Sequence, residues 1–293
     1  MKPAPFGYVA PRSLEEAVAV LQQNNLDGKI LAGGQSLLPL LNLRLAKPKV
    51  LIDVNGISDF DTIRETPESI SIGATTRQSK VENSSLVREK CPILTEAIRH
   101  IGHIAIRHRG TIGGSLVHAD PAAELPALTL ALDATFELAA EGRDRTVPAE
   151  EFFIDYMTTA LAPDEILLRI FFPVLRPYSG YALEEIARRH GDFAIAGVVT
   201  IVELDHAGKI AAARIALFGV APTPVRARGA ERTLIGQSPN EDTFRDAAAL
   251  VEEVLDPPED IRGTRAYRKR VAAILTARAL KKAVQLCHPS HVS

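Results

Sequence analysis

The chain has 293 residues, 46% of them hydrophobic, and its mean hydropathy is +0.04. A chain of this size and balance can bury a large core and divides into two or three units of ordinary domain size, which predicts a globular protein. Its 34 basic and 36 acidic residues give a formal charge of -2, so no overall field would gather nucleic acid or anionic lipid, and we expect neither as a partner.

The first predicted helix begins at Ser13. The segment 13–16, Ser-Leu-Glu-Glu, has the spacing of a capping box, and apolar residues follow it at helical period. A short strand within 28–34 then ends in glycines, and Ser36 can cap a leucine-rich helix that starts just after it. The sequence therefore predicts a strand, a tight glycine loop and a helix, in that order.

A second glycine loop follows two further predicted strands. KVLIDV (49–54) has the apolar run of a buried strand, and SISIGA (69–74) alternates isoleucine with serine as a half-buried strand does. The second loop spans 109–127, where Asp120-Pro121 breaks the chain and a helix is expected from about Ala122. It repeats the pattern of the first loop: glycines, a hydroxyl side chain and an apolar segment.

Prolines and glycines predict a domain boundary near residue 176. Before it, TFELAA (135–140) and EILLRIFFP (165–173) are typical of strands, with EGRDRT (141–146) as a polar turn. Pro177 and Gly180 follow within a few residues. We expect the chain to change domain here.

Beyond the boundary the sequence predicts a hairpin and three helices. Two apolar segments, 194–204 and 209–220, flank His206-Ala-Gly208 as the strands of a hairpin. Helical patterns cover about 225–235, 241–255 and 263–286. The last helix is expected to bury one apolar stripe, made of Tyr267, Val271, Ile274 and Leu275.

Glycine pairs such as those of the two loops can hold an anion. A missing Cβ permits positive φ and close approach, so that consecutive backbone N–H groups can point at one ligand. A hydroxyl such as that of Ser36 or Thr111 adds a donor, and a following helix N-terminus adds a favourable potential. The natural ligand is a phosphate or pyrophosphate. The alternative is that the glycines only form tight turns, and from the residues alone both interpretations stay open.

Other familiar sites lack their residues. The chain contains no GxGxxG opening a βαβ unit, no GxxxxGK[ST], no GxSxG and no HExxH. Four histidines, at 100, 103, 108 and 118, lie close together in sequence, but their spacing matches no helical pair of metal ligands. A loop in which these histidines contact Asp120 or Glu124 is the commoner outcome, so no metal site is predicted.

The cysteine content excludes an iron–sulfur cluster held by this chain. Cys91 and Cys287 are its only cysteines, which cannot form a disulfide scaffold or ligate a cluster and which fit a reducing compartment. The N-terminal residues lack the apolar core of a signal peptide, and the longest apolar runs are about half of the ~20 residues that a membrane helix needs. We expect a cytoplasmic protein without a membrane span.

Two long motifs carry a resemblance to a known family. LAGGQSLLPLLNLRLAKPKVLIDV (31–54) and IRHRGTIGGSLVHADPAAELPA (106–127) resemble the FAD-binding medium subunit of the molybdenum hydroxylases. This family includes carbon monoxide dehydrogenase, quinoline and nicotine dehydrogenases and xanthine dehydrogenase. RRHGDFAIAGV (188–198) and the segment 260–280 are similar to the same subunit, so the likeness covers nearly the whole chain.

The resemblance implies an α+β fold in two domains. The first would be an FAD-binding domain of the vanillyl-alcohol-oxidase type over 1–176, built from two α+β subdomains at about 1–56 and 57–176. The second, over 177–293, would combine a small antiparallel sheet with a helical bundle. FAD is the cofactor that this fold implies.

The resemblance also implies which residues bind FAD. The residues that would wrap the pyrophosphate are Ala32, Gly33, Gly34, Gln35 and Ser36. Those that would flank it are Ile30, Leu31 and Leu37. The second loop would contribute Thr111, Gly113, Gly114 and Ser115.

More distant residues would complete the cofactor site. Glu124 would bind the ribityl hydroxyls or a neighbouring group, and Ile101 and Leu167 would line the ring or adenine walls. Phe193 would lie near the isoalloxazine, or would be a plain core aromatic. Asp120 would be either a structural cap or a cofactor contact. Gln35, His108 and Ser115 differ from the residues common in relatives, which leaves the details of the flavin contacts open.

The implied function is that of an electron-transfer oxidoreductase subunit without catalytic residues of its own, because a flavin supplies the redox chemistry. A large molybdopterin-binding subunit would hydroxylate the substrate, and a small subunit with two [2Fe–2S] centres would pass electrons to this FAD, which delivers them to an external acceptor. A dimer of such heterotrimers is expected. Two alternatives are a self-contained flavin oxidase of related fold and a non-redox nucleotide-binding module.

Overall fold

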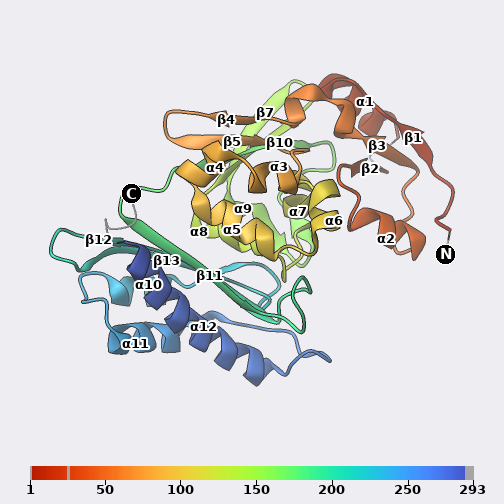
Figure 1. Ribbon diagram of the computed structural model, residues 1–293. Coiled ribbons are helices and arrows are strands. Elements are labelled where there is room, and N and C mark those ends of the chain that lie inside the picture. The colour runs from red at the N-terminus through yellow and green to blue at the C-terminus, as the bar shows by residue number, and fades with distance from the viewer. Residues whose placement is uncertain (1, 25–26, 288–293) are drawn as a thin grey trace.

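The computed structural model describes residues 2–24 and 27–287. Three main sheets follow one another along the chain, each with helices beside it (Figure 1), and a two-stranded hairpin forms a fourth, small sheet. The N-terminal sheet has three parallel strands, the middle sheet five antiparallel strands, and the C-terminal sheet four antiparallel strands. Together they confirm the predicted α+β class.

The N-terminal part is a small parallel sheet in the order β1-β3-β2. Its elements are β1 (Gly7–Val9), α1 (Leu14–Gln23), β2 (Gly28–Leu31), α2 (Leu37–Asn42) and β3 (Val50–Asp53). Ser13 Oγ accepts a hydrogen bond from Glu16 N at 3.2 Å, which confirms the predicted helix start. The short strand β1 was not predicted, because its residues Gly7–Val9 are exposed and carry no apolar alternation.

The middle part is a five-stranded sheet in the order β4-β5-β10-β6-β7. Its strands are β4 (Ile63–Glu65), β5 (Ser69–Gly73), β6 (Thr135–Ala140), β7 (Arg143–Pro148) and β10 (Ile166–Pro173). Its helices are α3 (Gln78–Glu82), α4 (Ser85–Lys90), α5 (Pro92–His100), α6 (Ile104–Arg109), α7 (Ile112–His118), α8 (Glu124–Ala131) and α9 (Ala149–Phe152). A hairpin of β8 (Phe153–Asp155) and β9 (Thr158–Thr159) precedes β10.

The C-terminal sheet is buried on both faces. In β12, Val199 and Ile201 belong to the core shared with the middle part, whereas Val198 and Val202 belong to the core formed with the C-terminal helices. Figure 1 shows these helices covering the outer face of the sheet. The elements are β11 (Ser179–Ile186), β12 (Ala196–Leu204), β13 (Ile210–Phe218), β14 (Val225–Arg226), α10 (Arg228–Leu234), α11 (Glu241–Val251) and α12 (Arg265–Leu286).

Three local predictions need correction. The second glycine segment is not a continuous loop, because helix α7 contains Gly113 and Gly114, and the next helix starts at Glu124 rather than at about Ala122. Four of the six residues of the predicted polar turn at 141–146 belong to β7, an edge strand whose residues are mostly exposed. The hairpin at 206–208 is confirmed, with Gly208 at a φ of +74°.

The predicted stripe of α12 is partly wrong, because Val271 packs against the C-terminal core whereas two other members are exposed. Leu275 is buried, but Tyr267 and Ile274 are 43% and 44% exposed. The helix instead turns small residues such as Ala272, Ala279 and Ala283 toward the sheet. A Cβ on Gly180 of β11 would overlap the carbonyl oxygen of Ala283, so small side chains are what allow this close approach.

Candidate functional site

The two glycine segments lie against each other, although one follows β2 and the other begins α7 (Figure 1). A Cβ on Gly33 would lie 2.5 Å from the carbonyl oxygen of Arg109 and 2.9 Å from Gly110 Cα. On the other side of this seam, a Cβ on Gly114 would lie 3.8 Å from Ala32 Cβ. The close approach that the sequence suggested at Gly33 is therefore made by the second segment of the protein itself.

The first segment carries an open row of donors. Gly34 has a φ of +71°, a conformation that favours glycine. In the part of the chain that the structure describes, the backbone N–H groups of Gly33, Gly34, Gln35 and Ser36 have no protein acceptor. Ser36 stands at the N-cap of α2, yet its hydroxyl makes no capping bond there. Residues 30–37 are all half-buried, so these donors fit a bound pyrophosphate.

The second segment uses its donors internally. Thr111 caps α7, where its Oγ1 accepts from Gly114 N at 3.0 Å. Ile112 N and Gly113 N donate to the carbonyls of Thr76 and Ala74 at 3.0 and 2.9 Å. A Cβ on Gly113 would lie 2.8 Å from Ala74 Cα. Gly113 thus allows α7 to pack on the end of β5, a different role from that of Gly34.

Sequence reasoning missed four polar residues beside this seam. Asn55, just after β3, donates from Nδ2 to the carbonyl of Ala32 at 2.9 Å and accepts from Arg77 Nη2 at 2.8 Å. Arg77 also donates from Nη1 to the carbonyl of Arg109. Asp53 accepts from Asn55 Nδ2 and from the Tyr8 hydroxyl, both at 2.6 Å. No motif connects these residues, and only the fold brings them together.

The hydrogen bonds around Asp53 determine its charge. Partial burial acts to raise the pKa of this carboxyl. The hydrogen bonds from Tyr8 and Asn55, together with the positive charge of Arg77, outweigh that effect and lower its pKa below the ordinary value. Asp53 is therefore a stable anion that fixes the orientation of the Asn55 amide.

Glu124 lies where the middle part meets the C-terminal sheet. It is the first residue of α8, and it is 6% exposed. Burial, reinforced by the nearby Glu185 carboxylate, raises the pKa of Glu124 to about 8. At neutral pH this carboxyl is largely protonated, so that it can donate a hydrogen bond as well as accept one.

A histidine of the predicted cluster contacts the C-terminal sheet rather than Asp120 or Glu124. The Nδ1 atom of His100 lies 3.1 Å from Glu185 Oε1, and this hydrogen bond raises the pKa of His100. Burial lowers the pKa of His118. Among the residues that the structure describes, no three His, Cys, Asp or Glu side chains are grouped closely enough to hold a metal ion.

Asp120 serves as a local cap. Its Oδ1 accepts from Ala122 N at 2.9 Å, and the neighbouring Pro121 carbonyl accepts from Gly219 N at 2.7 Å. The structure therefore contains the capping role that the sequence offered for Asp120, and it ties this turn to the C-terminal sheet. Ser115, which precedes this turn in helix α7, is half-buried.

The remaining predicted residues occupy different environments. Phe193 is 52% exposed, so its alternative assignment as a core aromatic is wrong. Its turn packs on the loop after α5, because a Cβ on Gly191 would lie 2.9 Å from the Gly102 carbonyl oxygen. Ile101 in that loop is half-buried. Leu167, by contrast, is 4% exposed and belongs to the core of the middle part.

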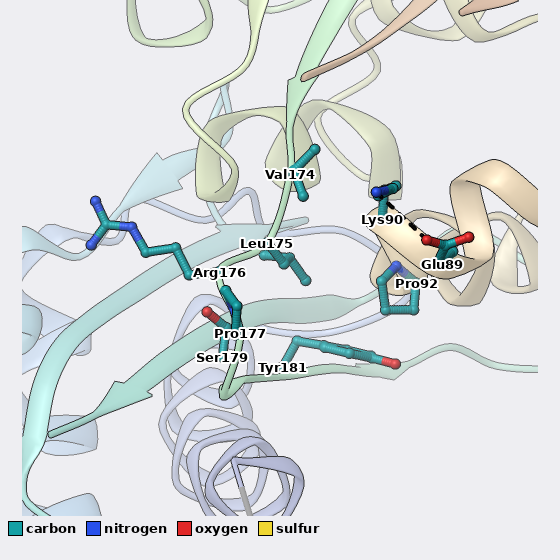
Figure 2. Close-up of a pocket in the computed structure, with 9 residues that line it drawn as sticks. All are labelled: Glu89, Lys90, Pro92, Val174, Leu175, Arg176, Pro177, Ser179 and Tyr181. Atoms are coloured by element: carbon teal, nitrogen blue, oxygen red, sulfur yellow. Dashed lines mark ion pairs between the residues drawn. The ribbon is translucent and has the colours of Figure 1, made fainter. Parts of the chain in front are cut away.

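A separate pocket of about 410 Å³ lies at the connection between the middle part and β11. Figure 2 shows Lys90 and Pro92 facing the connecting segment from one side and Tyr181 below it. The Nζ of Lys90 pairs with Glu89 at 3.5 Å and with Glu65 at 3.1 Å. Neither glycine segment contributes to the lining, so this pocket is distinct from the row of donors at Gly33–Ser36.

Across residues 2–24 and 27–287, no helix has the length and apolar character required to cross a membrane. The three longest helices instead carry charged residues along an exposed side.

Two family models together match most of the chain. The FAD binding domain in molybdopterin dehydrogenase matches residues 4–175, and the CO dehydrogenase flavoprotein C-terminal domain matches residues 181–283.

Individual relatives are similar over almost their full length. The chain is 40% identical to the 6-hydroxypseudooxynicotine dehydrogenase complex subunit alpha of Paenarthrobacter nicotinovorans, with 100% of this chain and 99% of that protein covered. It is 38% identical to the carbon monoxide dehydrogenase medium chain of Hydrogenophaga pseudoflava, with coverage of 98% and 100%. A solved structure of carbon monoxide dehydrogenase from the same organism has a TM-score of 0.96 at 39% identity, covering 98% of this chain and 100% of that one.

Proposed function

Because the chain belongs to the family of FAD-binding medium subunits of the molybdenum hydroxylases, we propose that its FAD lies along the seam between the two glycine segments. The observation that carries this placement is the row of backbone N–H groups from Gly33 to Ser36 without protein acceptors among the described residues. Such a row matches the charge and the acceptor oxygens of a pyrophosphate.

The remaining contacts follow the surroundings of each side chain. The side chains of Ile30, Leu31 and Leu37 flank the phosphate-binding row, and Ser36 and Thr111 add hydroxyls. Glu124, protonated at neutral pH, donates a hydrogen bond to a ribityl hydroxyl. Phe193 contacts the isoalloxazine from the C-terminal part, with Ile101 beside it. Leu167 supports the adenine wall from the core, where it is buried.

Bound FAD supplies both one-electron and two-electron redox steps. The chain accordingly accepts electrons from the [2Fe–2S] clusters of a partner subunit and passes them to an external acceptor, as an oxidoreductase subunit does in this family. Its own residues bind and orient the cofactor and hold a proton at the Glu124 carboxyl. Cys91 and Cys287 are both buried and have raised pKa values, about 12 and about 11, so neither thiol is poised for redox chemistry.

Two specific partners complete the proposed complex. A large molybdopterin-binding subunit hydroxylates the organic substrate, and a small subunit carries two [2Fe–2S] clusters. The three chains form a heterotrimer that pairs into a dimer in the cytoplasm. Arg188 and Arg189, both exposed beside the Phe193 turn, lie at the rim of the contact with the small subunit. Within this chain, the FAD-binding domain ends near residue 176 and the C-terminal domain follows from residue 177.

Reconstitution tests the proposed complex. The isolated chain, loaded with FAD, is expected to give no turnover of organic substrate with a dye acceptor, whereas addition of the molybdenum and iron–sulfur subunits restores turnover. Elemental analysis confirms that the isolated chain lacks both metals. Sustained turnover by the isolated chain would support the self-contained flavin oxidase instead.

A further inference from the structure

The seam between the two glycine segments is bridged by one pair of side chains. Asn55 reaches the first segment through the Ala32 carbonyl, and Arg77 reaches the second through the Arg109 carbonyl. The two side chains meet at 2.8 Å, from Arg77 Nη2 to Asn55 Oδ1. A continuous chain of hydrogen bonds therefore runs from one glycine segment to the other.

The Arg109 carbonyl oxygen takes part both in this chain of hydrogen bonds and in the close backbone contact between the two segments. The same oxygen that accepts from Arg77 lies 2.5 Å from the position that a Gly33 Cβ would occupy. Gln78, next to Arg77, donates from its backbone N–H to the Gly110 carbonyl at 2.9 Å. Hydrogen bonds from Asn55, Arg77 and Gln78 therefore fix individual peptide groups in both glycine segments.

The bridge also fixes the orientation of the donors. A carbonyl and the N–H of the next residue point in opposite directions across a peptide plane. When Asn55 holds the Ala32 carbonyl, it turns the N–H of Gly33 away from the bridge, toward the side where no protein acceptor is found among the described residues. The Asn55 amide is itself fixed by Asp53 Oδ1, which accepts from Nδ2 at 2.6 Å and from the backbone N at 3.0 Å.

Charge supports the same role. Arg77 is half-buried, and within residues 2–24 and 27–287 it forms no ion pair with a carboxylate. Its positive charge, which also helps to lower the pKa of Asp53, lies at the seam and would favour an anion bound there. Asn55 and Arg77 are both absent from the three hydrophobic cores of the molecule.

We infer that Asn55 and Arg77 form a clamp that positions the two glycine segments for the FAD pyrophosphate. They are positioning residues, because they act through the peptide groups of Ala32 and Arg109. The inference rests on the proposed placement of FAD and adds two residues on which tight binding depends.

The test compares FAD affinity among variants of the full chain after the flavin is removed, using quenching of FAD fluorescence. Arg77→Ala and Asn55→Ala should each weaken FAD binding by about tenfold, since each removes one charge-assisted link of the same bridge. The double variant should bind FAD no more weakly than the single variant with the lower FAD affinity, because either change alone opens the clamp. Arg77→Lys should recover part of the affinity, since it keeps the charge and one donor.

Controls separate this clamp from a general effect on folding. Arg64→Ala removes an exposed arginine of β4, whose only ion pair in the described chain is with Asp59 at 3.8 Å, and should leave FAD affinity unchanged. The unfolding midpoints of the flavin-free variants should stay close to that of the wild type. If Arg77→Ala does not fold, Asn55→Ala and Asn55→Asp test the clamp in its place. Both should weaken FAD binding, because neither side chain retains the donor to the Ala32 carbonyl.

Wild-type affinity in Arg77→Ala and Asn55→Ala would overturn the clamp while leaving the FAD site intact. Additive losses in the double variant would also overturn it, because they would show two independent contacts. A wild-type chain that binds no FAD at all would instead overturn the proposed function on which the clamp depends.

Discussion

At the scale of single residues, the four glycines for which the resemblance implied FAD binding have separate structural roles. Gly33 allows contact with the second segment, Gly34 adopts positive φ, and Gly113 allows α7 to pack on Ala74. Gly114 faces the Thr111 hydroxyl that caps its own helix. The resemblance implied that all four contact FAD, whereas the structure shows that protein atoms lie close to the Cβ positions of Gly33, Gly113 and Gly114.

Gly33→Ala is expected to remove bound FAD. The new Cβ would lie 2.5 Å from the Arg109 carbonyl oxygen and 2.9 Å from Gly110 Cα, both backbone atoms, so the segments must separate. Flavin content of the purified variant, measured by absorbance, checks this. Gly229→Ala in α10 is the matched control, because a Cβ there meets nothing within 4 Å and alanine favours a helix by about 1 kcal/mol. Full flavin content in Gly33→Ala would contradict the prediction.

Glu124 should make the flavin-free chain less stable as pH rises. The folded pKa of about 8 exceeds the ordinary value of 4.5, so the folded state binds more protons between these values, and stability falls across that window. The His100–Glu185 pair acts in the same direction, because folding raises the pKa of His100. The stability that this pair adds is complete below the pKa of the unfolded chain and is lost as pH rises through the folded pKa.

Glu124→Gln should flatten this dependence. The amide has no proton to lose, so the variant keeps more of its stability at pH 8, by on the order of a few kcal/mol. Thermal unfolding of flavin-free protein, followed by circular dichroism from pH 5 to pH 8, measures the difference. Identical pH profiles for the variant and the wild type would contradict a buried, protonated Glu124. His100→Gln serves as a comparison that removes only the smaller contribution.

At the scale of elements, patterns local in sequence predicted half of the helices and strands that the structure describes, and they missed the run of short helices from α3 to α7. The predicted cap at Ser13 is an example, because its Oγ accepts from Glu16 N and so the signal and the contact lie within three residues. The stripe of α12 was partly wrong because the surface on which a helix packs depends on its neighbours. Here the sheet approaches so closely at Gly180 that a small residue, Ala283, lies against it, while Leu275 and Leu280 are buried elsewhere along the helix.

Arg268 of α12 is expected to be important for the stability of the C-terminal part. The residue is 2% exposed, and its Nη1 donates to the carbonyls of Ile195 and Gly219 at 2.6 and 3.0 Å, while Nη2 donates to Asp260 at 2.7 Å. Arg268→Ala leaves these carbonyls without their donor, which should cost about 3 kcal/mol of unfolding free energy.

Urea unfolding checks the Arg268 prediction. Arg278→Ala changes an exposed arginine on the same helix and should alter the unfolding free energy by less than about 0.5 kcal/mol. Equal unfolding free energies for the two variants would show that the buried hydrogen bonds of Arg268 contribute little.

At the scale of the whole molecule, the resemblance of two glycine motifs to a known family predicted the cofactor and the two-part architecture. The clamp of Asn55 and Arg77 could not be predicted, because the two residues stand 22 positions apart and neither belongs to a recognisable pattern. The contact between His100 and Glu185 spans 85 positions and forms only when the C-terminal sheet covers α5. Contacts of this kind depend on the packing of one part of the chain on another.

All three parts of the chain contribute to the site that we propose for FAD. In the proposed site, the N-terminal sheet presents the open N–H row of Gly33–Ser36, the middle part supplies Thr111 and Glu124, and the C-terminal part supplies Phe193 from the turn that packs on Gly102. A cofactor that extends from a pyrophosphate to a flavin ring suits a site assembled from three parts.

The flavin released from the purified chain is the most direct test of this site. We predict noncovalent FAD, one per chain, because neither glycine segment places a buried cysteine or a clearly tethering histidine beside the donors. Acid precipitation followed by chromatography of the supernatant should recover FAD in amounts equal to the protein. Flavin that stays on the precipitated protein, FMN in place of FAD, or no flavin at all would contradict the prediction.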